Sequence, residues 1–309
     1  MGSNAVGERS LTLSRAWLRR WISREALTGW LFVLPALIGF VLFYLIPTLR
    51  AIEISFTDWN LLRPPRPVGL ENYQTLIADE NFWHALRVTG LYVLYNIPLQ
   101  TVLGLFLAVL MDRLVRALWL RAVVILPYLL SSIVVGMIFV WLLNPVLGYV
   151  NAFIQFLGLE KQAFFGSPDQ ALLTIAGVNI WKHMGLTALL FYAGLQSIPR
   201  SLYEAASIDG SGEWSTFWKI TLPLLRPVMA FVLVTSVIGS FQIYDMVAVT
   251  TGGGPAYATR VLVWYISENA FEFFKMGYAS ALSVVLFLIL VAFTLVQMRL
   301  LRANQSDLG

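Results

Sequence analysis

Three long apolar stretches of this sequence carry polar side chains at helical spacing, and these side chains could contact a solute. Residues three and four apart share one helix face, so each set forms a single stripe. Hydroxyl and amide groups beside aromatic rings supply the hydrogen bonds and stacking surface that a neutral sugar needs. We therefore predict a path for a polar solute, lined by Tyr128 and Ser132, by Asn179, Lys182, His183 and Leu186, and by Ser236, Gly239 and Ser240.

The composition leaves little for metal or covalent chemistry. The chain has no Cys, which excludes disulfides, Cys-bound metal and a thiol nucleophile, and its two His argue against a histidine metal site. Lys182 and His183 have no carboxylate partner within the apolar stretches, which argues against a membrane enzyme. No GxxxxGK[ST] phosphate-binding loop occurs. We predict a non-enzymatic chain with no metal and no cofactor of its own.

The elements that position these stripes must be membrane helices. Of the 309 residues, 58% are hydrophobic and only 12% are charged, and the mean hydropathy is +0.73. Such a chain has too little charge to cover a surface that faces water. A helix needs about 20 apolar residues to cross a bilayer. We predict an all-α, polytopic membrane protein with six transmembrane helices, at residues 30–49, 91–110, 122–143, 172–195, 228–244 and 279–298.

The basic residues set the predicted orientation. Lys and Arg are concentrated in the N-terminal lead and in the segments after the second, fourth and sixth spans, which places both termini in the cytoplasm. The pI of 9.4 then reflects a basic rim against anionic lipid, with no nucleic acid required. The first span is too long, and lies too far along the chain, for a cleaved signal peptide. The predicted organisation is a basic cytoplasmic lead (1–29), a transmembrane domain (30–300) and a cytoplasmic tail (301–309).

The predicted external connections are rich in turns. The segment 51–87 contains RPPRPVG and then an amphipathic stretch at residues 73–86. The segment 144–169 has several Gly and Pro residues, which favours short helical pieces separated by turns. The run TGGGP at residues 251–255 predicts a glycine turn outside the membrane.

The predicted cytoplasmic connection at about 197–226 is longer than two neighbouring membrane helices need. Apolar residues recur at helical spacing on both sides of Gly210 and Gly212, which predicts two short amphipathic helices that meet at a turn. One interpretation is an interfacial helix that lies on lipid headgroups, and the aromatic residues of the second half suit it. The other is a docked partner. We favour the partner, because Ala205 and Ala206 allow another backbone to approach closely.

This loop reads EAASIDGSGEWSTFWKITLP at residues 204–223, and it resembles the EAA signature of binding-protein-dependent ABC importer permeases. The runs VGLENY, ILPYLLSS, AGLQSIP, TGGGP and GYASALSVVLF extend the resemblance from about residue 30 to 300. They are similar to the sugar branch, specifically to the larger maltose-permease subunit and the glycerol-3-phosphate permeases. The resemblance implies a type I importer permease with the MetI-like fold, in a bacterial or archaeal cytoplasmic membrane.

The resemblance also implies partners and residue roles. The partners are a second homologous permease, two ATPases that bind ATP and Mg²⁺, an extracytoplasmic solute-binding protein and a carbohydrate. In the loop, Glu204 would make a charged contact with the ATPase, Ala205 and Ala206 the close-packed face, and Gly210 the turn, while Asp209 would cap the next segment. The sugar-contacting positions of the maltose-permease subunit align with the nine path residues given above.

Two departures from the maltose pattern leave alternatives open. Lys182 and His183 stand where the maltose subunit has uncharged residues. Lys182 could admit an anionic substrate such as a glycerol phosphate, it could snorkel, or it could pair with a carboxylate of the second permease. An ion-coupled secondary transporter is a competing function, but it would need paired intramembrane carboxylates and often an inverted repeat, and neither is visible.

Overall fold

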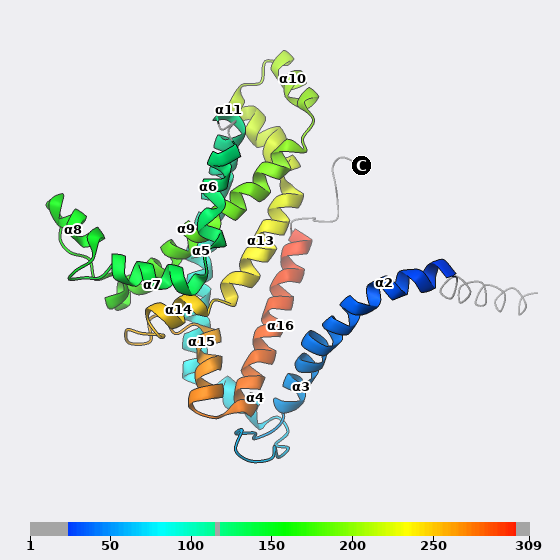
Figure 1. The fold of residues 1–309 in the computed structure, drawn as a ribbon, viewed down its shortest axis with the longest axis vertical. Coiled ribbons are helices and arrows are strands. Elements are labelled where there is room, and N and C mark those ends of the chain that lie inside the picture. The colour runs from blue at the N-terminus through cyan, green and yellow to red at the C-terminus, as the bar shows by residue number, and fades with distance from the viewer. Residues whose placement is uncertain (1–23, 115–117, 301–309) are drawn as a thin grey trace, which may run out of the picture. The chain divides into compact units, whose positions relative to one another are not determined.

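The computed structural model describes residues 24–114 and 118–300 and is almost entirely helical over them (Figure 1). These residues form no β-strand, only an isolated bridge between Thr57 and Pro67. The predicted all-α class is confirmed. The predicted lead, apart from residues 24–29, and the whole predicted tail lie outside the described residues, so this division of the chain stays a prediction.

The chain divides into two units between Ile54 and Ser55. In the first unit, α2 (Arg24–Phe40), the π-turn at Val41–Leu45 and α3 (Ile46–Ile54) follow one another without a break. The part from Thr28 to Ile54 is long and apolar enough to span a membrane, and none of it is buried within the chain. A helix that is apolar all round needs lipid or another protein around it.

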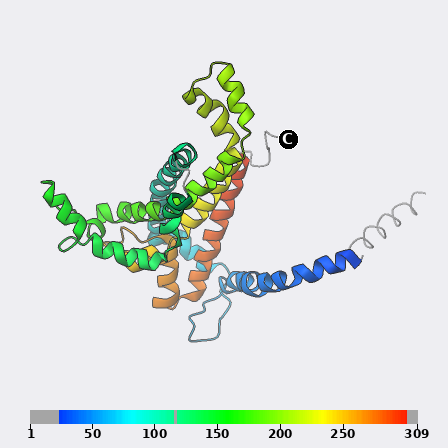
Figure 2. The ribbon, with the colours of Figure 1, turned by 45° about the horizontal axis from the view of Figure 1, so that its top comes forward.

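The second unit contains the remaining elements, and two long helices lie at its centre. These are α5 (Glu80–Leu114) and α9 (Pro168–Gln196), which pack on each other and on α13 (Arg226–Phe241) (Figure 2). The helices α5 and α9 approach closely at Gly104, where an added Cβ would lie 2.4 Å from the Thr187 methyl. The unit ends with α16 (Met276–Leu300), which contacts α13.

Shorter elements connect the long helices. Outside the predicted membrane region lie α4 (Glu71–Ala78), α8 (Tyr149–Phe156), α15 (Leu262–Ser267) and the π-turn η4 (Glu268–Glu272). The helices α6 (Leu118–Leu129), α7 (Ser132–Leu142) and α14 (Asp245–Thr250) flank the central pair. The loop at residues 197–226 contains α10 (Arg200–Ile208), α11 (Glu213–Thr216), the π-turn η3 (Phe217–Thr221) and α12 (Leu222–Leu224).

Six spans stay a prediction. Among the described residues, three helices are long and apolar enough to cross a membrane, and five spans result if two bent pairs are each counted as one. The predicted fourth span lies within α9, which is helical throughout, but Asn179, Lys182 and His183 lower its hydropathy.

The predicted third span is wrong as a single straight helix. Its two parts, α6 and α7, meet at an angle of 94°. Ser131 has extended backbone, with φ −58° and ψ 138°, and this ends the helix. Each part then packs on a different neighbour, α6 on α9 and α7 on α14. Tyr128 and Ser132 therefore belong to different helices and do not form one stripe.

The predicted amphipathic stretch at residues 73–86 is also divided. Asp79 takes an extended conformation between α4 and α5, and its Oδ1 accepts a hydrogen bond from the backbone N–H of Asn81 at 2.9 Å. This bond caps the start of α5. The predicted short pieces at 144–169 and the glycine turn at 251–255 are confirmed.

Candidate functional site

A cavity of about 250 Å³ opens at the centre of the second unit, between α5, α6, α9 and α13. Most of the predicted path residues line it, although their stripes lie on three different helices. The residues that line it are Asn96, Gln100, Tyr128, Asn179, His183, Leu186, Thr187, Leu190, Val232, Thr235, Ser236, Gly239 and Ser240. Three of the four predicted residues of α9 and all three of α13 therefore line one cavity.

Two predicted path residues, Ser132 and Lys182, do not line this cavity. Lys182 is 6% exposed, and its Nζ donates a hydrogen bond to Ser132 Oγ at 3.0 Å. The same Nζ lies 5.7 Å from the centre of the Tyr128 ring. The carboxylate of Asp245, the first residue of α14, is close enough for its charge to act on Lys182. The ammonium therefore has partners within its own chain, at the break between α6 and α7.

The sequence analysis missed four polar residues of the cavity, Asn96, Gln100, Thr187 and Thr235. Asn96 and Gln100 are the clearest omission, because they are polar, four residues apart and inside the predicted second span. The criterion that selected the serines of α13 would have selected them. Both are buried, at 1% and 6% exposure.

Asn96 and Gln100 connect three helices through hydrogen bonds. Asn96 Nδ2 donates to Ser240 Oγ of α13 at 3.0 Å, and Asn96 Oδ1 accepts from Asn179 Nδ2 of α9 at 3.1 Å. Gln100 Nε2 donates to Thr187 Oγ1 at 3.0 Å. Polar groups away from water need such partners, so the network fixes the wall of the cavity.

One ring nitrogen of His183 is bonded within its own helix, which leaves the other for a solute. Its Nδ1 lies 2.9 Å from the backbone oxygen of Asn179, and a carbonyl oxygen can only accept, so Nδ1 carries the proton. When the ring is neutral, Nε2 is left as an acceptor. The ring meets that of Tyr128 edge to face, with centroids 5.7 Å apart. The lining contains hydroxyls, amides, an imidazole and an aromatic face but no carboxylate, ammonium or guanidinium. Over the described residues, no group of three His, Asp or Glu could hold a metal ion.

The loop at residues 197–226 has the predicted form of two short helices at a turn. After α10, the N–H of Gly210 donates to the Ser207 oxygen at 3.1 Å and the N–H of Ser211 donates to the Ala206 oxygen at 2.9 Å. These two bonds define a Schellman motif, which requires a left-handed residue after the helix. Gly210 is that residue, with φ +72°.

Two placements in this loop, those of Ala206 and Asp209, differ from the expected roles. Glu204 and Ala205 are exposed, but Ala206 is 6% exposed and packs within its own chain. Asp209 is the C-cap of α10, and Gly212 precedes α11 with no side-chain cap, so the expected cap of the next helix by Asp209 is wrong. The sequence analysis did not single out Ile208, which is 86% exposed.

The loop is attached to the helices that line the cavity. The chain runs directly from α9 into α10, and Tyr203 and Thr221 share a hydrogen bond of 3.2 Å across the loop. At its base, a Cβ on Gly194 of α9 would lie 2.9 Å from both Leu225 and Val228, so α9 and the start of α13 pack tightly. The base of the loop is therefore packed against the two helices that line the cavity.

Comparisons with known proteins agree with this architecture. The family described as "Binding-protein-dependent transport system inner membrane component" matches residues 100–305. The chain belongs to this family, and it is an inner membrane component of such a transport system.

Relatives match along nearly the whole chain. The sulfoquinovosyl glycerol transport system permease protein SmoG of Agrobacterium fabrum is 37% identical over 92% of this chain and 94% of its own length. The trehalose/maltose transport system permease protein MalF of Thermococcus litoralis is 34% identical, over 92% and 96%. The sn-glycerol-3-phosphate transport system permease protein UgpA of A. fabrum is 33% identical, over 87% and 93%.

A solved structure shares the fold. A chain of the bacterial alginate ABC transporter, in complex with its alginate pentasaccharide-bound periplasmic protein, aligns with a TM-score of 0.77. The alignment covers 94% of this chain and 99% of that chain at 22% identity. The predicted MetI-like permease fold is thereby confirmed.

Proposed function

We propose that this chain is the transmembrane permease subunit of an ATP-driven, solute-binding-protein-dependent carbohydrate importer. One observation carries the proposal. The helices that line the polar cavity, α9 and α13, are the ones that hold the EAA loop between them. A loop that is gripped by a motor protein could move both cavity walls together.

The lining favours a carbohydrate as the transported solute. Hydroxyls and amides from three helices face one space beside the Tyr128 ring, and no charged side chain lines it. Such a surface offers directional hydrogen bonds and a stacking face. Two relatives are named for carbohydrate-containing substrates, sulfoquinovosyl glycerol and trehalose or maltose.

An anionic carbohydrate derivative, such as a glycerol phosphate, is the alternative. The cation of Lys182 lies behind Tyr128 and Ser132, at the break between α6 and α7. A relative is named for sn-glycerol 3-phosphate. Lys182 is 6% exposed and does not line the cavity, so a neutral sugar fits the present geometry better.

The proposal includes the partner proteins of the permease and the orientation of the chain in the membrane. A second, homologous permease would complete the path, and two ATPases that bind ATP and Mg²⁺ would grip α10 from the cytoplasm, where both termini lie. An extracytoplasmic binding protein would deliver the solute. Glu204 and Ala205 are exposed on α10 and so available to an ATPase, together with Asp209 and Gly210.

Uptake by proteoliposomes tests this proposal. The assembled complex, with ATP on the ATPase side and the solute-binding protein on the other, should accumulate the sugar that this binding protein retains. Removal of ATP or of the binding protein should abolish uptake. Uptake of the same sugar by vesicles that contain this chain alone would contradict the proposal and favour a channel or an ion-coupled transporter.

A further inference from the structure

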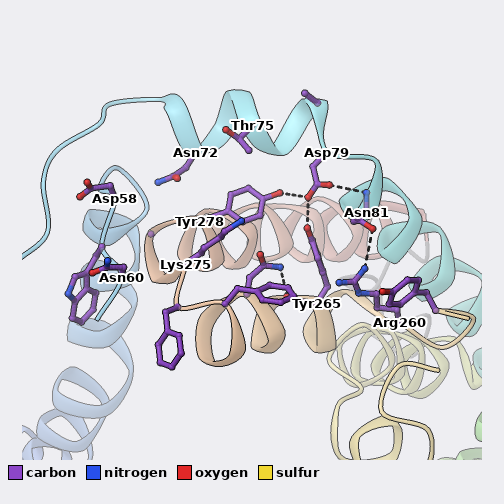
Figure 3. A pocket seen from close by; sticks show the side chains of 17 residues that line it. Asp58, Asn60, Asn72, Thr75, Asp79, Asn81, Arg260, Tyr265, Lys275 and Tyr278 are labelled. Atoms are coloured by element: carbon purple, nitrogen blue, oxygen red, sulfur yellow. Dashed lines mark hydrogen bonds between the residues drawn. The ribbon is translucent and has the colours of Figure 1, made fainter. Parts of the chain in front are cut away.

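A second cavity, of about 870 Å³ (Figure 3), lies in the same unit. It shares no lining residue with the cavity between α5, α6, α9 and α13, which we call the membrane-depth cavity. Its walls come from the loop that starts at Ser55, from α4, from α15 with η4 and from the start of α16. In Figure 1, α4 and α15 lie at the opposite end of this unit from α10. The predicted orientation places α10 inside the cell, so this cavity faces outward.

One end of the cavity is a fixed polar frame. The hydroxyls of Tyr265 and Tyr278 both donate to Asp79 Oδ2, the latter at 2.6 Å. Arg260 is 5% exposed, pairs with Glu268 and donates to Asn81 Oδ1 at 3.1 Å. Arg260 and Glu268 neutralise each other, and the tyrosine hydroxyls bind Asp79, so this end forms a preorganised wall.

The charge state of Asp79 follows from these contacts. Burial by itself disfavours the charged carboxylate, but hydrogen bonds from Tyr265, Tyr278 and Asn81 outweigh it and hold the pKa of Asp79 below its usual value. Asp79 is therefore an anion, and it accepts hydrogen bonds from residues that line the cavity.

Two other polar groups around the cavity have hydrogen-bond donors that are not used within the described residues. Asn60 Oδ1 accepts from the backbone N–H groups of Leu62 and Arg63, at 3.2 and 3.0 Å, which orients the amide. For the Nδ2 of Asn60 and the ammonium of Lys275, the described residues supply no hydrogen-bond partner. Figure 3 places both side chains at the cavity, on different elements.

Aromatic side chains complete the lining. Tyr257, Phe273 and Phe274 are 58%, 51% and 46% exposed, and Trp59 lines the same cavity. Aromatic residues at a membrane surface often face lipid headgroups. Here they surround a hollow that also contains amides and charges of both signs, including Asp58 and Lys275. Aromatic faces beside amides and balanced charge suit an uncharged saccharide better than an anion.

We propose that this cavity is an outer subsite for an uncharged saccharide unit, which rests on the carbohydrate importer proposed above. Its aromatic side chains, Trp59 and Phe274 among them, provide stacking faces for the C–H surface of a sugar ring, and Asn60 and Lys275 donate hydrogen bonds to its hydroxyls. Its volume lies within the range of about 300–1,000 Å³ that is usual for small-molecule sites. The subsite would hold the solute on the outer face before it reaches the membrane-depth cavity.

Saccharide binding to the whole complex tests the subsite. The complex, in nanodiscs and without the solute-binding protein, is titrated with radiolabelled trehalose and maltose by equilibrium dialysis. Trp59→Ala and Lys275→Ala should each weaken binding about tenfold. Phe271→Ala is the matched control, because Phe271 is 65% exposed in the same segment but does not line the cavity, and it should leave binding unchanged.

The other outcomes each overturn the subsite. The first is that the wild-type complex binds no saccharide. The second is that Asn179→Ala, in the membrane-depth cavity, is the only variant that weakens binding. The third is that the Trp59 and Lys275 variants lose affinity for the solute-binding protein but bind saccharide normally. ATP-dependent uptake by the wild-type complex, measured in parallel, separates this failure from that of the importer. If the wild-type complex takes up sugar but the outer cavity binds no saccharide, only the outer subsite is contradicted.

Discussion

Asn96 of α5 donates a hydrogen bond to Ser240 of α13 across 3.0 Å, although 144 positions separate the two residues in the chain. Asn96 also accepts from Asn179 of α9, so one buried amide connects three of the four helices around the cavity. In a membrane, polar contacts of this kind contribute to helix association where the hydrophobic effect contributes little. The wall that could bind solute is therefore also the joint that aligns the helices.

Asn96→Leu should lower both stability and transport. It leaves Ser240 and Asn179 without their partner, and each interhelical hydrogen bond in a membrane is worth about 0.6–2 kcal/mol. We expect a lower thermal unfolding midpoint of the purified complex and slower ATP-dependent uptake. Leu99→Ala is the control, because Leu99 lies on the same helix and is 51% exposed. It should change neither the unfolding midpoint nor the rate of uptake. Equal effects of both variants would show that the network has no special role.

Gly210→Ala should uncouple ATP hydrolysis from uptake. Gly210 has φ +72°, and a side chain there costs about 1–2 kcal/mol although no atom lies within 4 Å of the Cβ position. The strain opposes the turn after α10. Gly212→Ala is the matched control, because Gly212 has φ −70° and is equally open. The ratio of sugar transported to ATP hydrolysed should fall only in the first variant, and an unchanged ratio in both would contradict the role of the turn.

Gly185→Val should prevent normal assembly. A Cβ at Gly185 would lie 1.9 Å from the backbone oxygen of Val124, so α6 would have to move away from α9. Overpacking typically costs about 1–3 kcal/mol, and a backbone neighbour cannot rotate aside as a side chain can. Gly177→Val, on the same helix with nothing within 4 Å, is the control. The amount of folded complex extracted from membranes measures the effect, and equal yields would show that the contact is not required.

The stability of the region around Asp79 and Tyr265 should depend on pH only near the extremes. The pKa of Asp79 is below its usual 3.8 in the folded chain, so its contribution is present above 3.8 and is lost as pH falls through the lower folded value. Burial and the bond to Asp79 raise the pKa of Tyr265 from 10.0 to about 12, so that contribution is present below 10 and is lost as pH rises towards 12.

The thermal unfolding midpoint of the purified complex, measured as a function of pH, tests both the acid loss of stability (the acid limb) and the alkaline loss (the alkaline limb). Asp79→Asn should remove the acid limb, and Tyr265→Phe should reduce the alkaline limb. A wild-type midpoint that changes steeply between these limits, with no change in either variant, would show that other groups control the response.

The sequence predicted the helical class and the two stripes on α9 and α13, because residues at helical spacing must share a face. It did not predict the break at Ser131, since residues 122–143 are apolar enough overall to be one span, whereas in the structure α6 and α7 pack on different neighbours. The role of Asn96 was accessible but overlooked. The burial of Ala206 depends on the tertiary packing around α10, and no spacing rule reveals that.

The most direct test of the account is which side of the membrane the loop occupies and whether an ATPase covers it. The chain has no Cys, so Ile208→Cys gives a single thiol at a site that is 86% exposed. Leu157→Cys, at a 56% exposed site after α8, is the matched control for the predicted outer face. A membrane-impermeant thiol reagent should label the Ile208→Cys variant only from the cytoplasmic side and only in the absence of the ATPases, and the Leu157→Cys variant only from outside. Labelling of the Ile208→Cys variant from the outside, or to the same extent with the ATPases bound, would contradict the account.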